Sequence, residues 1–216
     1  MADLDVDRIA AAALAVADER GPSAFTMRAV AEALGVTPMA LYHHVADKSA
    51  LVGLVVEAVI EERPLPPPTG DWREDIWQLA RWMREITTAH PAVARLRRAH
   101  QVWTPSMLPM TEHWFNLWRQ SGLDLDDALL AGATTSMAIL GLVEEEQLFR
   151  EMVHPSDGAF AWAPNARLAF QRKTDPDAEF ELVVRSLVDG IHTRLTGTTD
   201  GRAALPPAPP RSSRSS

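Results

Sequence analysis

Apolar residues recur at intervals of three and four along most of the chain, which is the spacing of one face of an α-helix. The first such stretch spans residues 6–17, and Gly21-Pro22 predicts its end because proline cannot continue a helix. Shorter stretches follow at 26–34 and 37–45, and a longer one covers 47–62. Apolar and polar residues do not alternate convincingly anywhere, as they would in a strand. The pattern therefore predicts an all-α protein.

The second and third of these predicted helices have strong boundary signals. Thr26 and Thr37 can cap their first turns, because a threonine hydroxyl accepts from the free amides there. Gly35 can adopt the left-handed conformation that ends a helix, and Pro38 suits the first helical position of the next one. Two short helices joined by a glycine-bearing turn form a helix-turn-helix, which places its second helix in the major groove of DNA.

A proline-rich segment, residues 64–70, separates these helices from a second set. Proline at this density resists helix formation and behaves as a stiff spacer. Further helices are predicted at 71–89, 92–101, 107–120, 124–150 and 175–195, with a loop at 154–164. The end of the chain is rich in proline, serine and arginine, which predicts disorder. We therefore expect domains at 1–63 and 71–196, a linker at 64–70 and a disordered tail at 197–216.

Composition and motifs narrow the classes of protein. The chain has no cysteine, which excludes disulfides and thiolate metal sites. It lacks an uninterrupted run of about 18 apolar residues, so no membrane span is expected, and its acidic N-terminus is unlike a secretory signal. The signatures of serine hydrolases, dinucleotide-binding folds, P-loops and zinc peptidases do not occur. We expect a cytoplasmic protein that is not an enzyme, with no cofactor, metal site or catalytic residue.

The charge distribution limits how the chain could bind nucleic acid. The net charge is −8, and residues 1–63 carry five basic against ten acidic side chains. None of these acids falls within residues 33–46, so they could lie away from a bound duplex. We therefore expect few phosphate contacts and modest nonspecific affinity.

The run Leu41-Tyr42-His43-His44-Val45, between Leu34-Gly35-Val36 and Asp47-Lys48-Ser49-Ala50-Leu51, resembles the DNA-binding domain of the TetR family of bacterial transcriptional regulators. The resemblance covers roughly residues 5–60, and the remainder is more loosely similar to the ligand-binding half of the tetracycline-repressor class. It implies an N-terminal three-helix DNA-binding domain followed by a larger helical domain for ligand binding and dimerisation. The expected protein is a homodimeric repressor that binds a palindromic operator and is released by a small molecule. A ligand-independent or activating regulator is the alternative.

Nine residues are candidates for DNA contacts. The N-terminal residues of a recognition helix face the base edges, which assigns five residues to the groove: Thr37, Pro38, Met39, Tyr42 and His43. The resemblance implies phosphate contacts for Tyr42 and His44 and a guanine-reading role for Arg28, whose guanidinium suits bidentate contact. Tyr42 could instead be a plain surface aromatic, and adjacent histidines on a helix do not share the direction that a metal site needs. The full set is Thr26, Arg28, Thr37, Pro38, Met39, Tyr42, His43, His44 and Lys48.

Six of the seven tryptophans lie between residues 72 and 118. Large aromatic residues are core residues by default, but such a cluster also suits an apolar pocket between helices. The resemblance implies a pocket among the helices at 71–89, 107–121 and 125–150. The expected lining residues are Leu79, Trp82, Met83, Ile86, Trp103, Trp114, Trp118, Ser136, Ile139 and Leu140.

The resemblance also bears on the ligand, because the tetracycline-repressor class holds a magnesium–drug chelate through polar and histidine side chains. The corresponding positions here carry Leu79, Met83, Arg97 and Trp114. We therefore expect a larger, more hydrophobic effector, such as an aromatic compound, and no required magnesium. Glu145 matches the metal-side acid of the family, or it belongs to a surface run with its two acidic neighbours.

Two helices are candidates for the dimer interface that the resemblance implies. Residues 131–136 are small, which permits close approach of a neighbouring helix, and the last helix has a wide apolar stripe. The alternative for the last helix is burial within one subunit. The helix from Lys48 to Glu62 joins the helix-turn-helix to the larger domain, so we expect it to transmit the effector signal.

Overall fold

The computed structural model describes residues 4–151, 165, 168 and 175–197, and no strand occurs among them, which confirms the all-α class. The helices are α1 (Val6–Ala24), α2 (Met27–Leu34), α3 (Pro38–Tyr42), α4 (Lys48–Glu61), α5 (Trp72–Ala89), α6 (Pro91–Ala99), α7 (Met107–Gln120), α8 (Leu125–Glu151) and α10 (Pro176–Thr196). The loop expected at 154–164 and the tail expected at 197–216 lie outside the described residues, apart from Gly197.

The helix ends in the N-terminal part are set by the local signals that the sequence contains. The side chains of Thr26, Thr37 and Asp47 each accept from the backbone amide three residues on, at 3.1, 3.2 and 2.8 Å. Gly35 ends α2 with φ 68° and ψ 31°, in the left-handed region. The expected stop at Gly21-Pro22 is a kink: Gly21 leaves the helical conformation at φ 74°, and one further turn reaches Ala24.

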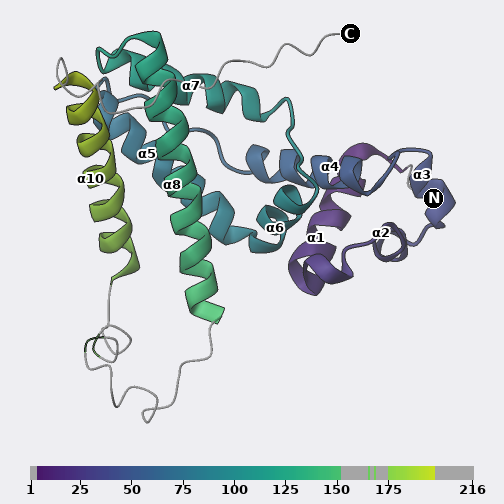
Figure 1. Cartoon of the computed structure of the whole chain (residues 1–216). Coiled ribbons are helices and arrows are strands. Elements are labelled where there is room, and N and C mark those ends of the chain that lie inside the picture. Colours follow the sequence, from purple (N-terminus) through teal and green to yellow (C-terminus); the bar gives the residue numbers. More distant parts are fainter. Residues whose placement is uncertain (1–3, 152–164, 166–167, 169–174, 198–216) are drawn as a thin grey trace, which may run out of the picture.

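The hydrophobic interior forms two clusters, whose helices lie at opposite ends of the molecule in Figure 1. The first cluster joins α1, α2 and α4 and also includes Ala92, Val93 and Leu96 of α6. The second cluster joins α5, α7, α8 and α10. Helix α6 contacts both α1 and α4, so it packs on the N-terminal helices although it follows the proline-rich segment in the chain.

The segment between α4 and α5 has no helix, as its prolines predict. Its C-terminal end is fixed by Asp75, whose carboxylate accepts from the backbone N–H of Thr69 at 2.7 Å and from the Thr69 hydroxyl at 2.6 Å. Its N-terminal end is held by Trp82, whose indole N–H donates to the carbonyl oxygen of Arg63 at 3.1 Å. The spacer therefore lies against α5 at both ends.

The small residues of α8 permit a close approach, but to α7 of the same chain. A Cβ on Gly132 would lie 2.7 Å from Cδ1 of Phe115 and 3.3 Å from Nε1 of Trp114. The indole N–H of Trp114 donates to the carbonyl oxygen of Gly132 at 2.8 Å, and both groups are buried. At Gly132, the small residue thus serves packing within the subunit.

The apolar stripe of α10 is divided between two surroundings. Phe180, Val184 and Val188 are buried in the second cluster, where α10 packs on α5 and α8. Leu182 and Val183 are exposed on the same helix. Part of the apolar stripe of α10 is therefore buried within the subunit, which was the alternative to a dimer contact, and another part lies on the surface.

Helix α8 bears on the expectation that the chain has no membrane span. By length and composition its segment Leu125–Phe149, with a mean hydropathy of 1.3, is apolar enough to cross a membrane. The same segment packs against α5, α7 and α10, as the core helix of a globular domain also does, so composition alone is weak evidence for a membrane span.

Candidate functional site

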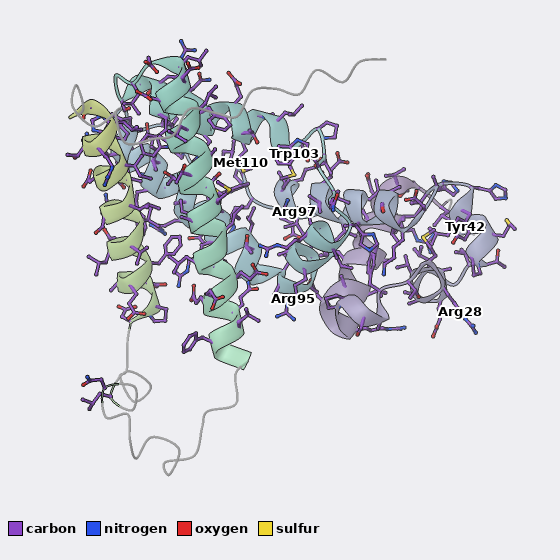
Figure 2. All side chains as sticks on the ribbon, in the orientation of Figure 1. Arg28, Tyr42, Arg95, Arg97, Trp103 and Met110 are labelled. Carbon is purple, nitrogen blue, oxygen red and sulfur yellow. The ribbon has the colours of Figure 1, made fainter. Side chains whose placement is uncertain are left out.

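The helix-turn-helix presents its polar side chains to solvent. Figure 2 shows Arg28 and Tyr42 at the end of the molecule that lies away from α8 and α10. Arg28 is exposed, Tyr42 is 49% exposed and Met39 is 67% exposed. Leu41 and Val45 are buried in the first cluster and hold α3 in place. A DNA-reading helix must present exposed side chains to the groove while its buried side chains fix it to the rest of the domain, and α3 has both features.

The remaining candidates for DNA contacts lie at the ends of the same helices. The hydroxyls of Thr26 and Thr37 accept from backbone amides, and each keeps its own O–H hydrogen for donation to a phosphate. Pro38, His43 and His44 are exposed. Lys48 is partly buried, with its Nζ 5.8 Å from the centre of the Phe25 ring, which holds this cation at the start of α4.

A cavity of about 360 Å³ lies between the N-terminal helices and the larger domain. Val56, Val59 and Ile60 of α4 form one wall, and residues of α5, α6, α7 and α8 form the others. Met110 of α7 and Arg97 of α6, both labelled in Figure 2, belong to the lining. A cavity of this size is within the range of small-molecule sites in proteins.

The structure brings two of the ten expected pocket residues, Ile86 and Leu140, to this cavity. Trp103 is 58% exposed, and Ser136 is partly buried with its hydroxyl donating to the carbonyl oxygen of Ala133. The other six pack inside the second cluster: Leu79, Trp82, Met83, Trp114, Trp118 and Ile139. Most of the expected lining residues are therefore part of the packed interior, and two of them border the cavity.

The physical reason is that the tryptophans fill the space between α5, α7 and α8. Trp118 is fully buried against Trp72, with ring centres 5.7 Å apart. The open space lies instead on the side of α5 and α8 that faces α4 and α6. None of the ten expected lining residues lies on α4 or α6, since only tertiary packing brings these helices beside the cavity; the family resemblance alone pointed to Arg97 of α6.

His90 lies at the junction of the two parts and lines the cavity. Its Nδ1 is 2.8 Å from a carboxylate oxygen of Asp18 in α1, and its Nε2 is 3.0 Å from one of Glu62, directly after α4. Burial opposes protonation of His90, but the hydrogen bonds to the two carboxylates outweigh it and raise the pKa of the imidazole above its ordinary value. One side chain thus ties α1, α4 and the start of α6 together.

The three consecutive glutamates of α8, residues 144–146, each have a different environment. Glu144 lines the cavity and pairs with Arg98, and Glu146 accepts two hydrogen bonds from Arg84 at 2.8 Å each. Glu145 is exposed between them. Within the described part of the chain, no group of three or more histidine, aspartate or glutamate side chains is arranged to hold a metal ion.

Both halves of the chain match known families. Residues 9–55 match the model of bacterial regulatory proteins of the tetR family, and residues 63–195 match the tetracyclin repressor-like C-terminal domain. The chain is 30% identical over 203 residues to the tetracycline repressor protein class A from transposon 1721 of Escherichia coli, with 90% of this chain and 93% of that protein covered. It is also 31% identical over 148 residues to an HTH-type transcriptional regulator of Saccharopolyspora erythraea. That match covers 68% of this chain and 63% of the length of the relative.

Solved structures share the fold over most of its length. ActR of Streptomyces coelicolor in complex with actinorhodin is 28% identical, with a TM-score of 0.71 and coverage of 93% of this chain and 99% of that chain. BioQ with its natural double-stranded DNA operator is 25% identical, with a TM-score of 0.68 and coverage of 88% and 99%. These relatives and neighbours are similar to this chain in both of its halves.

Proposed function

The chain belongs to the TetR family of bacterial regulatory proteins, and on that premise we propose that it is a repressor controlled by a small molecule. In this proposal a homodimer binds a palindromic operator through the helix-turn-helix and leaves it when an apolar, ring-bearing compound enters the cavity. The relatives are transcriptional regulators, and both halves of the chain match families of regulatory proteins.

One observation carries the proposal: the cavity borders α4 directly. Val56, Val59 and Ile60 line it, and α4 begins at Lys48, where the helix-turn-helix ends. A ligand that fits one position of α4 better than another changes the population of the two positions. Because α4 is joined to the reading helices, such a shift changes the spacing of the two DNA-binding domains in a dimer.

The network around His90 supports coupling by the same route. His90 lines the cavity and contacts carboxylates of α1 and of the segment after α4. A ligand that displaces this side chain would therefore disturb the packing of α6 on the DNA-binding domain. Coupling between two sites is reciprocal, so operator DNA would also weaken the binding of the ligand.

The dimer is supported by exposed apolar side chains on neighbouring helices. Helices α8 and α10 contact one another and lie side by side in Figure 1. Their large exposed apolar residues are Leu125, Leu129, Leu130, Met137, Leu148, Phe149, Leu182 and Val183. A surface of this kind on two adjacent helices suits an isologous contact with a second copy. Light scattering at micromolar concentration tests it: the mass of a monomer would overturn the dimer.

The operator and its release can be tested without knowing the regulated genes. Selection from a random duplex pool should enrich an inverted repeat with half-sites about one helical turn apart, since a C2 dimer presents two reading helices at that spacing. Actinorhodin, which ActR holds in its crystal structure, is the first compound to add to the complex. Enrichment of a single half-site would contradict the dimeric arrangement. If the protein stayed on its operator in the presence of every compound that binds the cavity, the ligand-independent regulator would be the better account.

A further inference from the structure

We propose that the effector is an organic acid and that Arg97 binds its anionic group inside the cavity. The proposal rests on the proposed function of the cavity as an effector site, and it adds the chemical class of the ligand and the residue that selects it. The chemistry that fits is an apolar frame of one or more rings that carries a carboxylate.

Arg97 lies in the last turn of α6 and belongs to the same cavity lining as Met107, Met110 and Leu140. Figure 2 shows its place between α6 and α8. The side chain is partly buried, and among the described residues its guanidinium has no hydrogen bond and no ion pair. A guanidinium has five N–H donors, so this arginine retains its full capacity to bind an anion.

The other polar groups of the cavity wall are already engaged. Arg98 pairs with Glu144, and His90 lies between Asp18 and Glu62. The amide of Gln147 donates to the carbonyl oxygen of Thr87 at 3.1 Å. Arg95 also lines the cavity but is exposed and has an interaction of its own. Arg97 is therefore the cation of the described cavity wall that is left for a ligand.

The surroundings of Arg97 favour the arrival of an anion. Burial, and after it the positive charge of Arg98, lower the pKa of Arg97 from its ordinary value. Removing a cation from water is unfavourable unless a partner compensates it. A carboxylate opposite the guanidinium would offset both the burial and the repulsion, and the planar fork of arginine matches a carboxylate with two parallel hydrogen bonds.

The rest of the lining determines the body of the ligand. Val56, Val59 and Ile60 come from α4, Ile86 from α5, and Leu140 from α8. Their side chains offer no hydrogen bonds, so an apolar frame fits them and a sugar or nucleotide does not. An acid held by Arg97 would thus place its apolar part against α4, the helix that joins the cavity to the reading unit.

The experiment compares acids with their neutral amides on the whole protein. The probes are anthraquinone-2-carboxylate and 2-naphthoate, each paired with its carboxamide, and the readout is the dissociation constant from calorimetry. We expect the wild type to prefer each acid, and Arg97→Gln to weaken acid binding about 10- to 100-fold while changing amide binding less than about threefold. Arg119→Gln is the control, because it removes the same charge from an exposed position that does not line the cavity, and it should leave the preference in place. Arg97→Lys should retain part of it.

Three results would overturn the proposal: no binding of either acid, equal affinity of the wild type for acid and amide, or an equal loss of preference in the Arg119 and Arg97 variants. Circular dichroism confirms that each variant is folded. The same variants are also titrated with the selected operator. If the acids bind through Arg97 but do not release the operator, the ligand class stands and the proposed repressor function fails. If neither acid binds while another compound releases the operator, the ligand class fails and the function stands.

Discussion

The Nδ1 atom of His90 lies 2.8 Å from a carboxylate oxygen of Asp18, which ties the residue before α6 to the first helix of the chain. This contact joins the two parts of the molecule beside the cavity, and it depends on the charge of the imidazole. Stability and coupling should therefore both respond to its protonation.

His90→Gln should destabilise the protein more at pH 6 than at pH 9. The pKa of His90 is raised in the folded protein, so its stabilisation is fully present below the ordinary pKa of 6.5 and is lost as the pH rises through the folded value. At pH 6 we expect the free energy of unfolding of the variant to fall by about 1 kcal/mol, which lowers the melting temperature by about 2–4 °C. Calorimetry measures both. Asp18→Asn in the His90→Gln background should add little; full additivity at pH 6 would contradict the bridge.

Arg28→Ala and Lys48→Ala should affect operator binding in different ways. Arg28 is exposed at the start of α2, and we propose that its guanidinium reads a base edge. Loss of the Arg28 side chain should reduce the binding free energy for the operator by about 1–3 kcal/mol and relax the preference at one base position. Loss of the Lys48 side chain should weaken binding to all DNA sequences alike. Fluorescence anisotropy on the selected operator and on single-base variants measures both. An Arg28 variant with an unchanged preference at every position would refute base reading by this residue.

Trp114→Phe should be more destabilising than Trp118→Phe. Both side chains are buried in α7, but the indole N–H of Trp114 donates to the carbonyl oxygen of Gly132 at 2.8 Å, whereas that of Trp118 has no hydrogen-bond partner among the residues that the structure describes. Replacement by phenylalanine removes a hydrogen bond in the first case and an unsatisfied donor in the second. The difference in the free energy of unfolding should be about 1 kcal/mol, obtained from urea titrations of the two variants. An equal loss of stability in both variants would mean that the change in ring volume, and not the hydrogen bond of Trp114, determines the effect.

Gly132→Ala should destabilise the protein by about 1–3 kcal/mol, because the new Cβ would lie 2.7 Å from the Phe115 ring. Gly53→Ala in α4 is the control. There the new Cβ would meet Thr104 and Val102 at 3.9 Å, an ordinary contact, so the higher helix propensity of alanine should leave stability unchanged or improve it. Melting temperatures compare the two directly. A neutral Gly132→Ala would show that α7 and α8 can separate without loss.

The parts of the structure that could be predicted from sequence are those set by neighbours in the chain. The hydroxyls of Thr26 and Thr37 and the left-handed Gly35 define the reading helices within a few residues, so their boundaries could be derived locally. Arg28 and Tyr42 are exposed, as their assignment to the DNA-reading surface requires.

The cavity could not be predicted in the same way, because it depends on contacts between distant segments. Val93 and Leu96 pack into the first cluster with α1 and α4, and this packing brings Arg97 and His90 beside the cavity. The spacing of the residues near them does not signal that arrangement; only the family resemblance, which puts Arg97 at a ligand-reading position, points to it. The tryptophans give a strong signal of burial, but a pattern of burial does not distinguish a filled interior from the wall of a cavity.

The central claim is that a ligand in the cavity changes the affinity of the reading helices for DNA, and one titration tests it directly. Operator affinity is measured by anisotropy for the free protein and for the protein saturated with a compound that raises its melting temperature. A cavity-filling variant, Leu140→Trp, serves as the control, since Leu140 lines the cavity and lies far in sequence from the reading unit. The account predicts that the ligand weakens operator binding of the wild type about 5- to 150-fold and leaves that of the variant unchanged. Equal operator affinity for the free and the saturated wild-type protein would contradict it.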